Sequence, residues 1–262
     1  MCLGSFLRSI YLVQSNFSDS SNNGVLTCAI EHFTHLDIEF LHALGPFVYL
    51  AKHHKYGTVV FKFAESIPQK LRLKNEAEFS HQHPSNSWPN LLDYTTYRSL
   101  NILMNSYQEG DSLAEIIKQG RQTSVNFQQL EELVGQLHQH GFIHGDLKPS
   151  NIIVHPEKPP SLIDFGCCCK IGTPYSEHSA KGITPSFSGL VPAHSLKATN
   201  NDDWYSMAII KCVLGGQHPY KGVSLSEALK ENIAPNFNSL PSKYQLIVNK
   251  RFSEMRGYVN NL

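Results

Sequence analysis

The sequence predicts an α+β fold in which an antiparallel sheet is followed by a mainly helical part. Three strand-like runs come first, at residues 35–44, 47–53 and 58–64, and short turn signals separate them. Further on, residues 127–140 repeat leucine and valine at helical spacing, and a second apolar helix is expected over residues 203–214. The length of 262 residues is enough for one two-lobed unit or for two small domains.

Composition argues against several classes of function. The 22 basic and 22 acidic side chains give a formal net charge of zero, so we expect no nucleic-acid partner. The apolar runs are too short for a membrane span, and the first residues make a poor signal peptide. Six cysteines, three of them adjacent, form no pair of CxxC motifs. We therefore expect a cytoplasmic protein in a reducing compartment.

Residues 142–166 form the most informative stretch. Three polar side chains, Asp146, Asn151 and Asp164, stand there in apolar surroundings. Two short apolar runs on either side of a turn-forming segment predict a tight hairpin. Asp146 and Asn151 precede this hairpin and Asp164 follows it, so we expect folding to bring the three side chains to one end.

That grouping suits phosphoryl transfer. Asp164 and Asn151 offer hard oxygen ligands of the kind that Mg²⁺ accepts alongside phosphate oxygens. Asp146 can accept a hydrogen bond from an attacking hydroxyl group. Lys148 can neutralise a phosphoryl group during its transfer.

The stretch closely resembles the catalytic loop and the metal-binding segment of the protein kinase superfamily. A His-Gly-Asp triplet ending at Asp146, Asn151 five residues later and an Asp-Phe-Gly triplet beginning at Asp164 make a highly specific combination. The resemblance covers about residues 36–255 and implies a two-lobed kinase-like fold, with a small sheet lobe and a mainly helical large lobe. The implied division is residues 1–25 as a leader, 26–105 as the small lobe and 106–262 as the large lobe.

Lys62 lies in the apolar third strand, where a charged side chain needs an anionic partner. The resemblance implies that Lys62 holds the α- and β-phosphates of a nucleotide and pairs with a glutamate on the next helix, expected over residues 68–82. Glu76 is our first candidate, because its local pattern resembles the usual one. Glu78 is the competitor and faces a different side of the helix. The alternative for Lys62 is an exposed side chain on an edge strand.

The resemblance also implies an adenine pocket. Its candidate residues are Leu44, Val48, Val60, Met104, Ser106, Tyr107 and Ile153. Asn105 competes with Met104 for the back of the pocket. Backbone groups near Ser106 and Tyr107 would bind the adenine edge.

The chain departs from the family pattern at several positions. The glycine-rich loop that covers phosphates is missing, because the connection at residues 44–48 is about four residues short and Pro46 removes an amide donor. Gly145 replaces the usual arginine, so we expect competence without phosphorylation of the activation segment, or control by a regulatory partner protein. Ala193 replaces a glutamate whose salt bridge normally braces the large lobe.

Residues 170–197 match the activation segment on which a kinase rests its substrate, and Thr184 is one of its candidate autophosphorylation sites. One thiol among Cys167–Cys169 is a candidate reactive group near the nucleotide, the alternative being three semi-buried cysteines with no role. Asp203 would bond the backbone of the catalytic loop. Helices are expected around residues 224–232 and 240–253.

We therefore predict an ATP-dependent serine/threonine protein kinase that uses Mg²⁺, or Mn²⁺ as an alternative, and acts on protein substrates. Lys148 favours serine and threonine over tyrosine as acceptors. Two other functions stay open. The stunted loop suggests a pseudokinase that serves as a binding or scaffolding module, and the His-Gly-Asp triplet also occurs in small-molecule phosphotransferases of the aminoglycoside or choline kinase type. A secreted effector is the alternative to a cytoplasmic protein.

Overall fold

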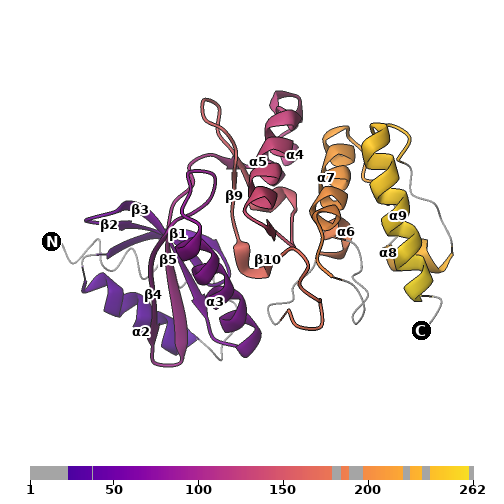
Figure 1. Cartoon of the computed structure of the whole chain (residues 1–262). Helices are drawn as coiled ribbons and strands as arrows, with labels where there is room; N and C mark the ends of the chain where they lie inside the picture. Colours follow the sequence, from indigo (N-terminus) through magenta and orange to yellow (C-terminus); the bar gives the residue numbers. More distant parts are fainter. Residues whose placement is uncertain are drawn as a thin grey trace. The chain divides into compact units, whose positions relative to one another are not determined.

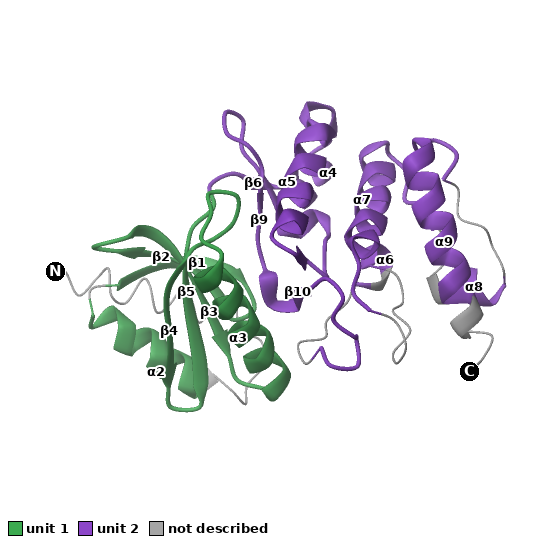
Figure 2. Cartoon of the chain, in the orientation of Figure 1, with its two compact units in different colours: residues 1–108 green, residues 109–262 purple. Residues whose placement is uncertain are grey.

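The computed structural model describes residues 23–36, 38–178, 184–188, 197–220, 225–231 and 237–259. The chain forms two compact units, residues 1–108 and 109–262, which are coloured separately in Figure 2. A five-stranded antiparallel sheet dominates the first unit and helices dominate the second, which confirms the predicted α+β class.

Unit 1 is built on a sheet with the strand order β1-β2-β3-β5-β4. Its strands are β1 (Ile38–Gly45), β2 (Val48–His53), β3 (Gly57–Ala64), β4 (Leu91–Tyr97) and β5 (Leu100–Ser106). Residues Gly45 and Val48 are paired, so Pro46 and Phe47 alone connect β1 to β2. The connection is therefore as short as the sequence predicts.

The two faces of this sheet are covered by different helices (Figure 1). Helix α2 (Asn23–Thr34) packs Leu26, Ile30 and Phe33 into the larger apolar cluster, which takes alternate residues of the strands. Helix α3 (Ile67–Gln82) buries Leu73 and Ala77 against the other face. The sequence predicts α3 but not α2, whose first residues fall in the segment that we expected to be a leader.

Local signals fix where α3 begins. Ser66 caps the helix in a capping box with Gln69: the Ser66 side chain accepts from the Gln69 amide, and the Gln69 side chain accepts from the Ser66 amide. Pro68 lies in the first turn, where no intrahelical amide donor is needed. The start of α3 is therefore set by sequence, and it determines which face Glu76 presents to the sheet.

Unit 2 contains two small sheets, with strand orders β10-β7 and β6-β8-β9. The strands are β6 (Asp111–Ser112), β7 (Phe142–Ile143), β8 (Ile152–Val154), β9 (Ser161–Leu162) and β10 (Cys169–Lys170). The α-helices are α4 (Leu113–Lys118), α5 (Phe127–Gln139), α6 (Pro185–Ser188), α7 (Asn200–Leu214), α8 (Leu225–Lys230) and α9 (Ser242–Val259). Short 3₁₀ helices are η1 (Gln122–Ser124), η2 (Pro149–Asn151) and η3 (Phe165–Cys167).

Most predicted elements of unit 2 are confirmed. Strands β8 and β9 form the expected hairpin, and α5 buries the leucine and valine side chains that repeat at helical spacing. Helix α7 is buried along most of its length and contacts both α5 and α9. Helices α8 and α9 lie where the last two helices were expected. Helix α7 therefore lies at the centre of the packing in this unit.

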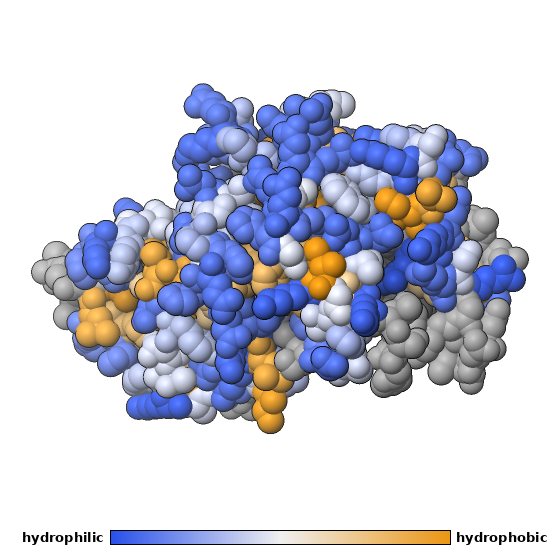
Figure 3. Space-filling view, in the orientation of Figure 1, coloured by the Kyte–Doolittle hydropathy of each residue, from blue (hydrophilic) through white to orange (hydrophobic). Residues whose placement is uncertain are grey.

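One face of the molecule is largely polar. Hydrophilic residues predominate on the face shown in Figure 3, and hydrophobic residues form small separate patches there. Within the described residues, no helix combines the length and the apolar character needed to cross a membrane.

Candidate active site

A buried ion pair stands on the α3 side of the sheet in unit 1. Lys62 Nζ lies 2.9 Å from Glu76 Oε1 and 2.8 Å from Glu76 Oε2. The Glu76 side chain is only 2% exposed and that of Lys62 17%, so the pair is largely removed from water. Glu78, the competing candidate, lies 3.6 Å from Lys74 in an exposed pair. The predicted pairing of Lys62 with Glu76 is therefore the one that forms.

Asn105, not Met104, shares this face of the sheet. Lys62 pairs with Leu103 and Val60 pairs with Asn105, so these residues point to the same side. Met104 pairs with Phe61 and is buried in the apolar cluster beneath α2. The choice of Met104 for the back of an adenine pocket is wrong, because alternation along β5 turns its side chain away. Asn105 is the candidate that shares the face of Lys62.

The remaining pocket candidates of unit 1 differ in accessibility. Val48 pairs with Lys62 across β2 and β3 and is half-buried. Leu44 is 50% exposed. The Ser106 amide donates to the carbonyl oxygen of Asn90 at 3.0 Å, so this donor is not available for an adenine edge. Of the two backbone positions predicted there, the amide of Tyr107 stays a candidate donor.

In unit 2, the carboxylate of Asp146 is held by two other side chains. Lys148 Nζ donates to Asp146 Oδ2 at 2.6 Å, and the hydroxyl of Thr184 donates to Asp146 Oδ1 at 2.8 Å. Lys148 also donates to the Thr184 oxygen at 3.2 Å. Asp146 is 8% exposed. The three groups form a closed hydrogen-bonded triangle, so Thr184, which the sequence suggests as a candidate autophosphorylation site, contacts Asp146 directly.

Asn151 forms hydrogen bonds with the loop that carries Asp146 and with the hairpin that follows. Its Nδ2 donates to the carbonyl oxygen of Asp146 at 3.0 Å, and the residue is 4% exposed. The backbone of Asn151 accepts a hydrogen bond from the amide of Ile163, the residue before Asp164. This confirms that the hairpin brings Asp146, Asn151 and Asp164 to one end.

Asp164 occupies an unusual backbone conformation. Its φ and ψ are both 67°, in the left-handed region that costs a residue with a Cβ roughly 1–2 kcal/mol. The neighbours hold it there. Ile163 O is contacted at 3.0 Å by His144 Nε2, and Phe165 is fully buried against the His144 ring. Strain maintained by packing at a carboxylate is typical of functional positions.

Ile153, the last predicted pocket residue, lies in β8, paired with Ser112 of β6 and Ser161 of β9. It is 9% exposed. Gly110, whose φ is +132°, approaches the same strand so closely that a Cβ there would lie 2.5 Å from the carbonyl oxygen of Val154. The backbone at the start of unit 2 is therefore packed directly on the hairpin.

Asp203 of α7 holds the backbone of the loop that leads to Asp146. Its carboxylate accepts from the amides of His144 at 2.8 Å and Gly145 at 3.1 Å, as the sequence predicts. His138 Nε2 lies 3.0 Å from the same carboxylate, which explains this histidine as a structural residue. Gly145 has a φ of +78°, and a Cβ there would lie 2.5 Å from the carbonyl oxygen of Cys167. Backbone therefore packs on backbone where the family pattern has an arginine.

The adjacent cysteines that follow Gly166 are all buried. Burial raises the pKa of the Cys169 thiol to about 12, and the neighbouring Asp203 and Asp202 add to this effect. A thiol with such a pKa is almost entirely protonated at neutral pH and reacts slowly. The idea of a reactive thiol is therefore wrong for Cys169.

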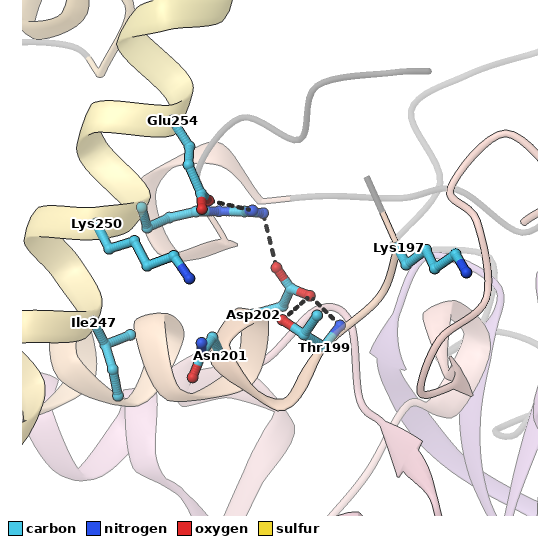
Figure 4. A pocket seen from close by; sticks show the side chains of 8 residues that line it. Lys197, Thr199, Asn201, Asp202, Ile247, Lys250 and Glu254 are labelled. Atoms are coloured by element: carbon cyan, nitrogen blue, oxygen red, sulfur yellow. Dashed lines mark hydrogen bonds and ion pairs between the residues drawn. The ribbon is translucent and has the colours of Figure 1, made fainter. Parts of the chain in front are cut away.

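A second polar feature of unit 2 is the ion pair between α7 and α9. Arg251 Nη2 lies 2.9 Å from Asp202 Oδ1, and Asp202 in turn accepts from the Thr199 amide at 2.7 Å. Arg251 Nη1 also lies 3.6 Å from Glu254 Oε2. These residues line a pocket of about 100 Å³, and Figure 4 shows Asp202 and Glu254 at that pocket. Burial raises the pKa of Asp202, although Arg251 opposes this shift.

This buried pair braces the unit. Residues 191–193, where the family's bracing glutamate is replaced, lie outside the described residues. Two helices far apart in the sequence are nevertheless joined by Arg251 and Asp202. The loss of that glutamate therefore does not leave unit 2 without a buried ion pair.

The donors near Asp164 fit a magnesium ion only if phosphate oxygens complete its shell. Within the described part of the chain, no three His, Cys, Asp or Glu side chains gather closely enough to hold a metal ion themselves. One carboxylate and one amide oxygen, from Asp164 and Asn151, are the sparse set by which proteins hold Mg²⁺ on a nucleotide. Asn151 Nδ2 donates within the loop, and Asn151 Oδ1 accepts a hydrogen bond from the Ser150 hydroxyl at 3.4 Å.

Comparison with known proteins decides the family. The family model described as a protein kinase domain matches residues 47–255. The chain belongs to the protein kinase family. It is 28% identical over 209 residues to a probable serine/threonine-protein kinase of Clostridium perfringens, a match that covers 71% of this chain and 30% of that protein. Over 187 residues it is 28% identical to the probable serine/threonine-protein kinase gdt4 of Dictyostelium discoideum, covering 69% of this chain and 11% of that protein.

A viral relative is more similar over a shorter stretch. Serine/threonine-protein kinase 1 of Heliothis zea nuclear polyhedrosis virus is 31% identical over 136 residues, which is 48% of either chain. This kinase-family chain therefore spans less than half of the length of each of these relatives. The family assignment confirms the two-lobed kinase fold that the motifs imply.

Sequence reasoning missed the contact of Thr184 with Asp146, left Asn105 only as the competitor of Met104, and missed helix α2. Thr184 lies 38 positions from Asp146, and no local pattern connects the two. Asn105 could be separated from Met104 only once the pairing of β3 with β5 was known. The helical spacing of Leu26, Ile30 and Phe33 was a signal for α2 that could have been used.

Proposed function

We propose that the chain is a serine/threonine protein kinase that transfers the γ-phosphoryl group of ATP to a hydroxyl group of a protein substrate. One observation carries this proposal: Asp146 already accepts a hydrogen bond from an aliphatic hydroxyl, that of Thr184, at 2.8 Å. A substrate hydroxyl that takes the same partner would be oriented for attack, and Asp146 would accept its proton.

The other groups would neutralise the charge of the phosphates and hold them in position. Lys148, 2.6 Å from Asp146, would neutralise the phosphoryl group during transfer. Lys62, fixed by Glu76, would hold the α- and β-phosphates. Asp164 and Asn151 would hold Mg²⁺, which supplies charge neutralisation on the phosphates. Catalysis would then rest on positioning and electrostatics, without a covalent intermediate.

One observation favours a second candidate, a pseudokinase that binds without catalysis. Pro46 and Phe47 alone join β1 to β2, so few backbone amides are available to cover phosphates. Against it stands the complete set of charged groups at Lys62, Asp146 and Asp164. Weaker phosphate binding would raise the ATP concentration that the enzyme needs without removing the reaction.

The test measures transfer of radiolabel from [γ-³²P]ATP to casein and to myelin basic protein. The wild-type chain is compared with Asp146→Ala and Asp164→Ala, with a parallel panel of sugars and aminoglycosides as acceptors. The proposal predicts label in protein that both substitutions abolish. Equal background label with all three proteins would contradict the proposal and favour the pseudokinase. Label only in the small molecules would indicate a small-molecule phosphotransferase.

A further inference from the structure

Asn105 is a polar side chain at a buried position of the central sheet. It lies in β5, pairs with Val60 of β3 and is 1% exposed. Its Nδ2 donates to Glu76 Oε1 at 3.2 Å, which is the same oxygen that Lys62 contacts at 2.9 Å. Asn105 therefore joins the buried pair as a third, uncharged member from another strand.

The Asn105 side chain is expected to lower the stability of the folded protein at this position. Its Oδ1 is buried and has no hydrogen-bond partner among the residues that the structure describes. A buried acceptor left unpaired costs about 1–3 kcal/mol, whereas an apolar side chain of similar size would carry no such cost. Leu103, the nearest residue of β5 on this face, is apolar and fully buried. An asparagine here is therefore poorly explained by stability alone.

The hydrogen bond restricts the Glu76 carboxylate. Lys62 Nζ contacts both carboxylate oxygens, at 2.9 and 2.8 Å, and a single ammonium group does not define how the carboxylate is rotated. A second donor on Oε1, coming from β5, selects one orientation. It also connects α3, which carries Glu76, to the strand next to that of Lys62.

We propose that Asn105 is a positioning residue that holds Glu76, and through it Lys62, in the arrangement needed for phosphoryl transfer. The inference rests on the proposed kinase function for its consequence in catalysis, while the contact itself lies within unit 1. The chain thereby forms its lysine–glutamate pair by its own contacts. Phosphorylation of the activation segment is then unnecessary for the formation of this pair.

The test replaces Asn105 by leucine, which removes the donor and keeps a similar volume. The matched control is Met104→Leu, the adjacent residue of β5 on the opposite face of the sheet. Three quantities are measured for each protein: the melting temperature, the hydrogen exchange of the α3 amides, and the kcat and KM for ATP with a protein acceptor.

We expect Asn105→Leu to melt no lower than wild type, to exchange its α3 amides faster, and to lose about tenfold or more in kcat with a smaller change in KM. Met104→Leu should leave exchange and kcat close to wild type. Two results would overturn the inference: α3 exchange unchanged in Asn105→Leu, or a kcat loss accompanied by an equally lowered melting temperature in both variants.

The test of Asn105 can be decided even if the proposed kinase function fails. If wild type transfers no more phosphate than Asp146→Ala, the kinase proposal fails. The exchange of α3 then still decides whether Asn105 positions Glu76, because that measurement needs no catalysis. Faster α3 exchange in Asn105→Leu alone supports the positioning role, and equal exchange in the two leucine variants refutes it.

Discussion

Replacing Gly145 by alanine tests how tightly the loop before Asp146 is held. Gly145 has a φ of +78°, and an added Cβ would lie 2.5 Å from the carbonyl oxygen of Cys167. Gly141 has nearly the same backbone conformation, with a φ of +83°, but a Cβ there would meet no atom within 4 Å. The two substitutions therefore separate backbone strain from steric overlap.

The magnitudes follow from these contacts. A left-handed conformation costs a residue with a Cβ about 1–2 kcal/mol, which is the whole loss expected for Gly141→Ala. Gly145→Ala adds the cost of overpacking, about 1–3 kcal/mol, because the Cys167 carbonyl must move away. The total for Gly145→Ala is thus about 2–5 kcal/mol. The same displacement moves Asp146, and a shift of about 1 Å in a catalytic group can reduce the rate roughly 10²-fold.

Urea-unfolding midpoints and phosphotransfer rates of the two variants provide the measurement. The account predicts that Gly145→Ala is the less stable protein and that it alone loses most of its activity. Gly141→Ala should retain nearly the wild-type rate. If the two alanine variants are equally stable and equally active, the close packing of the loop on Cys167 is not what positions Asp146.

Three further predictions concern unit 2. Arg251→Met should destabilise the protein by about 3–5 kcal/mol at pH 7, because Asp202 is left buried without its cation; unfolding midpoints should recover as the pH falls and Asp202 takes up a proton, and no loss at pH 7 would contradict the brace. Thr184→Val keeps the side-chain shape but removes the hydroxyl group; we expect a several-fold change in kcat with stability nearly unchanged, and an unaltered rate would exclude a role for Thr184 at Asp146. Cys169, with a pKa of about 12, should resist iodoacetamide at pH 8 in the native protein and react after unfolding; mass spectrometry that finds it rapidly modified in the native state would contradict its burial.

Local signals in the sequence were enough for much of the fold. The hairpin of β8 and β9 follows from two apolar runs around a turn, and α3 matches the helix expected over residues 68–82. The choice of Glu76 over Glu78 also rested on neighbouring residues, and the ion pair with Lys62 confirms it. These features depend on residues close together in the chain, which is why sequence patterns capture them.

The errors have a different origin. Met104 and Asn105 are adjacent, and only the register between β3 and β5 decides which of them faces Lys62. Thr184 reaches Asp146 across 38 positions, and Arg251 reaches Asp202 from another helix. Such contacts arise from tertiary packing, so no pattern within a short window reports them. Helix α2 is an exception, since its apolar spacing was present and was outweighed by the polar residues before it.

The most direct measurement of the central claim is the rate of γ-phosphoryl transfer by Asp146→Asn compared with wild type, at matched and saturating Mg-ATP. The substitution preserves size and removes the proton acceptor. The account predicts a fall of about 10²–10⁴-fold in kcat, with ATP binding unchanged in a thermal-shift titration. A wild-type rate in Asp146→Asn would contradict it.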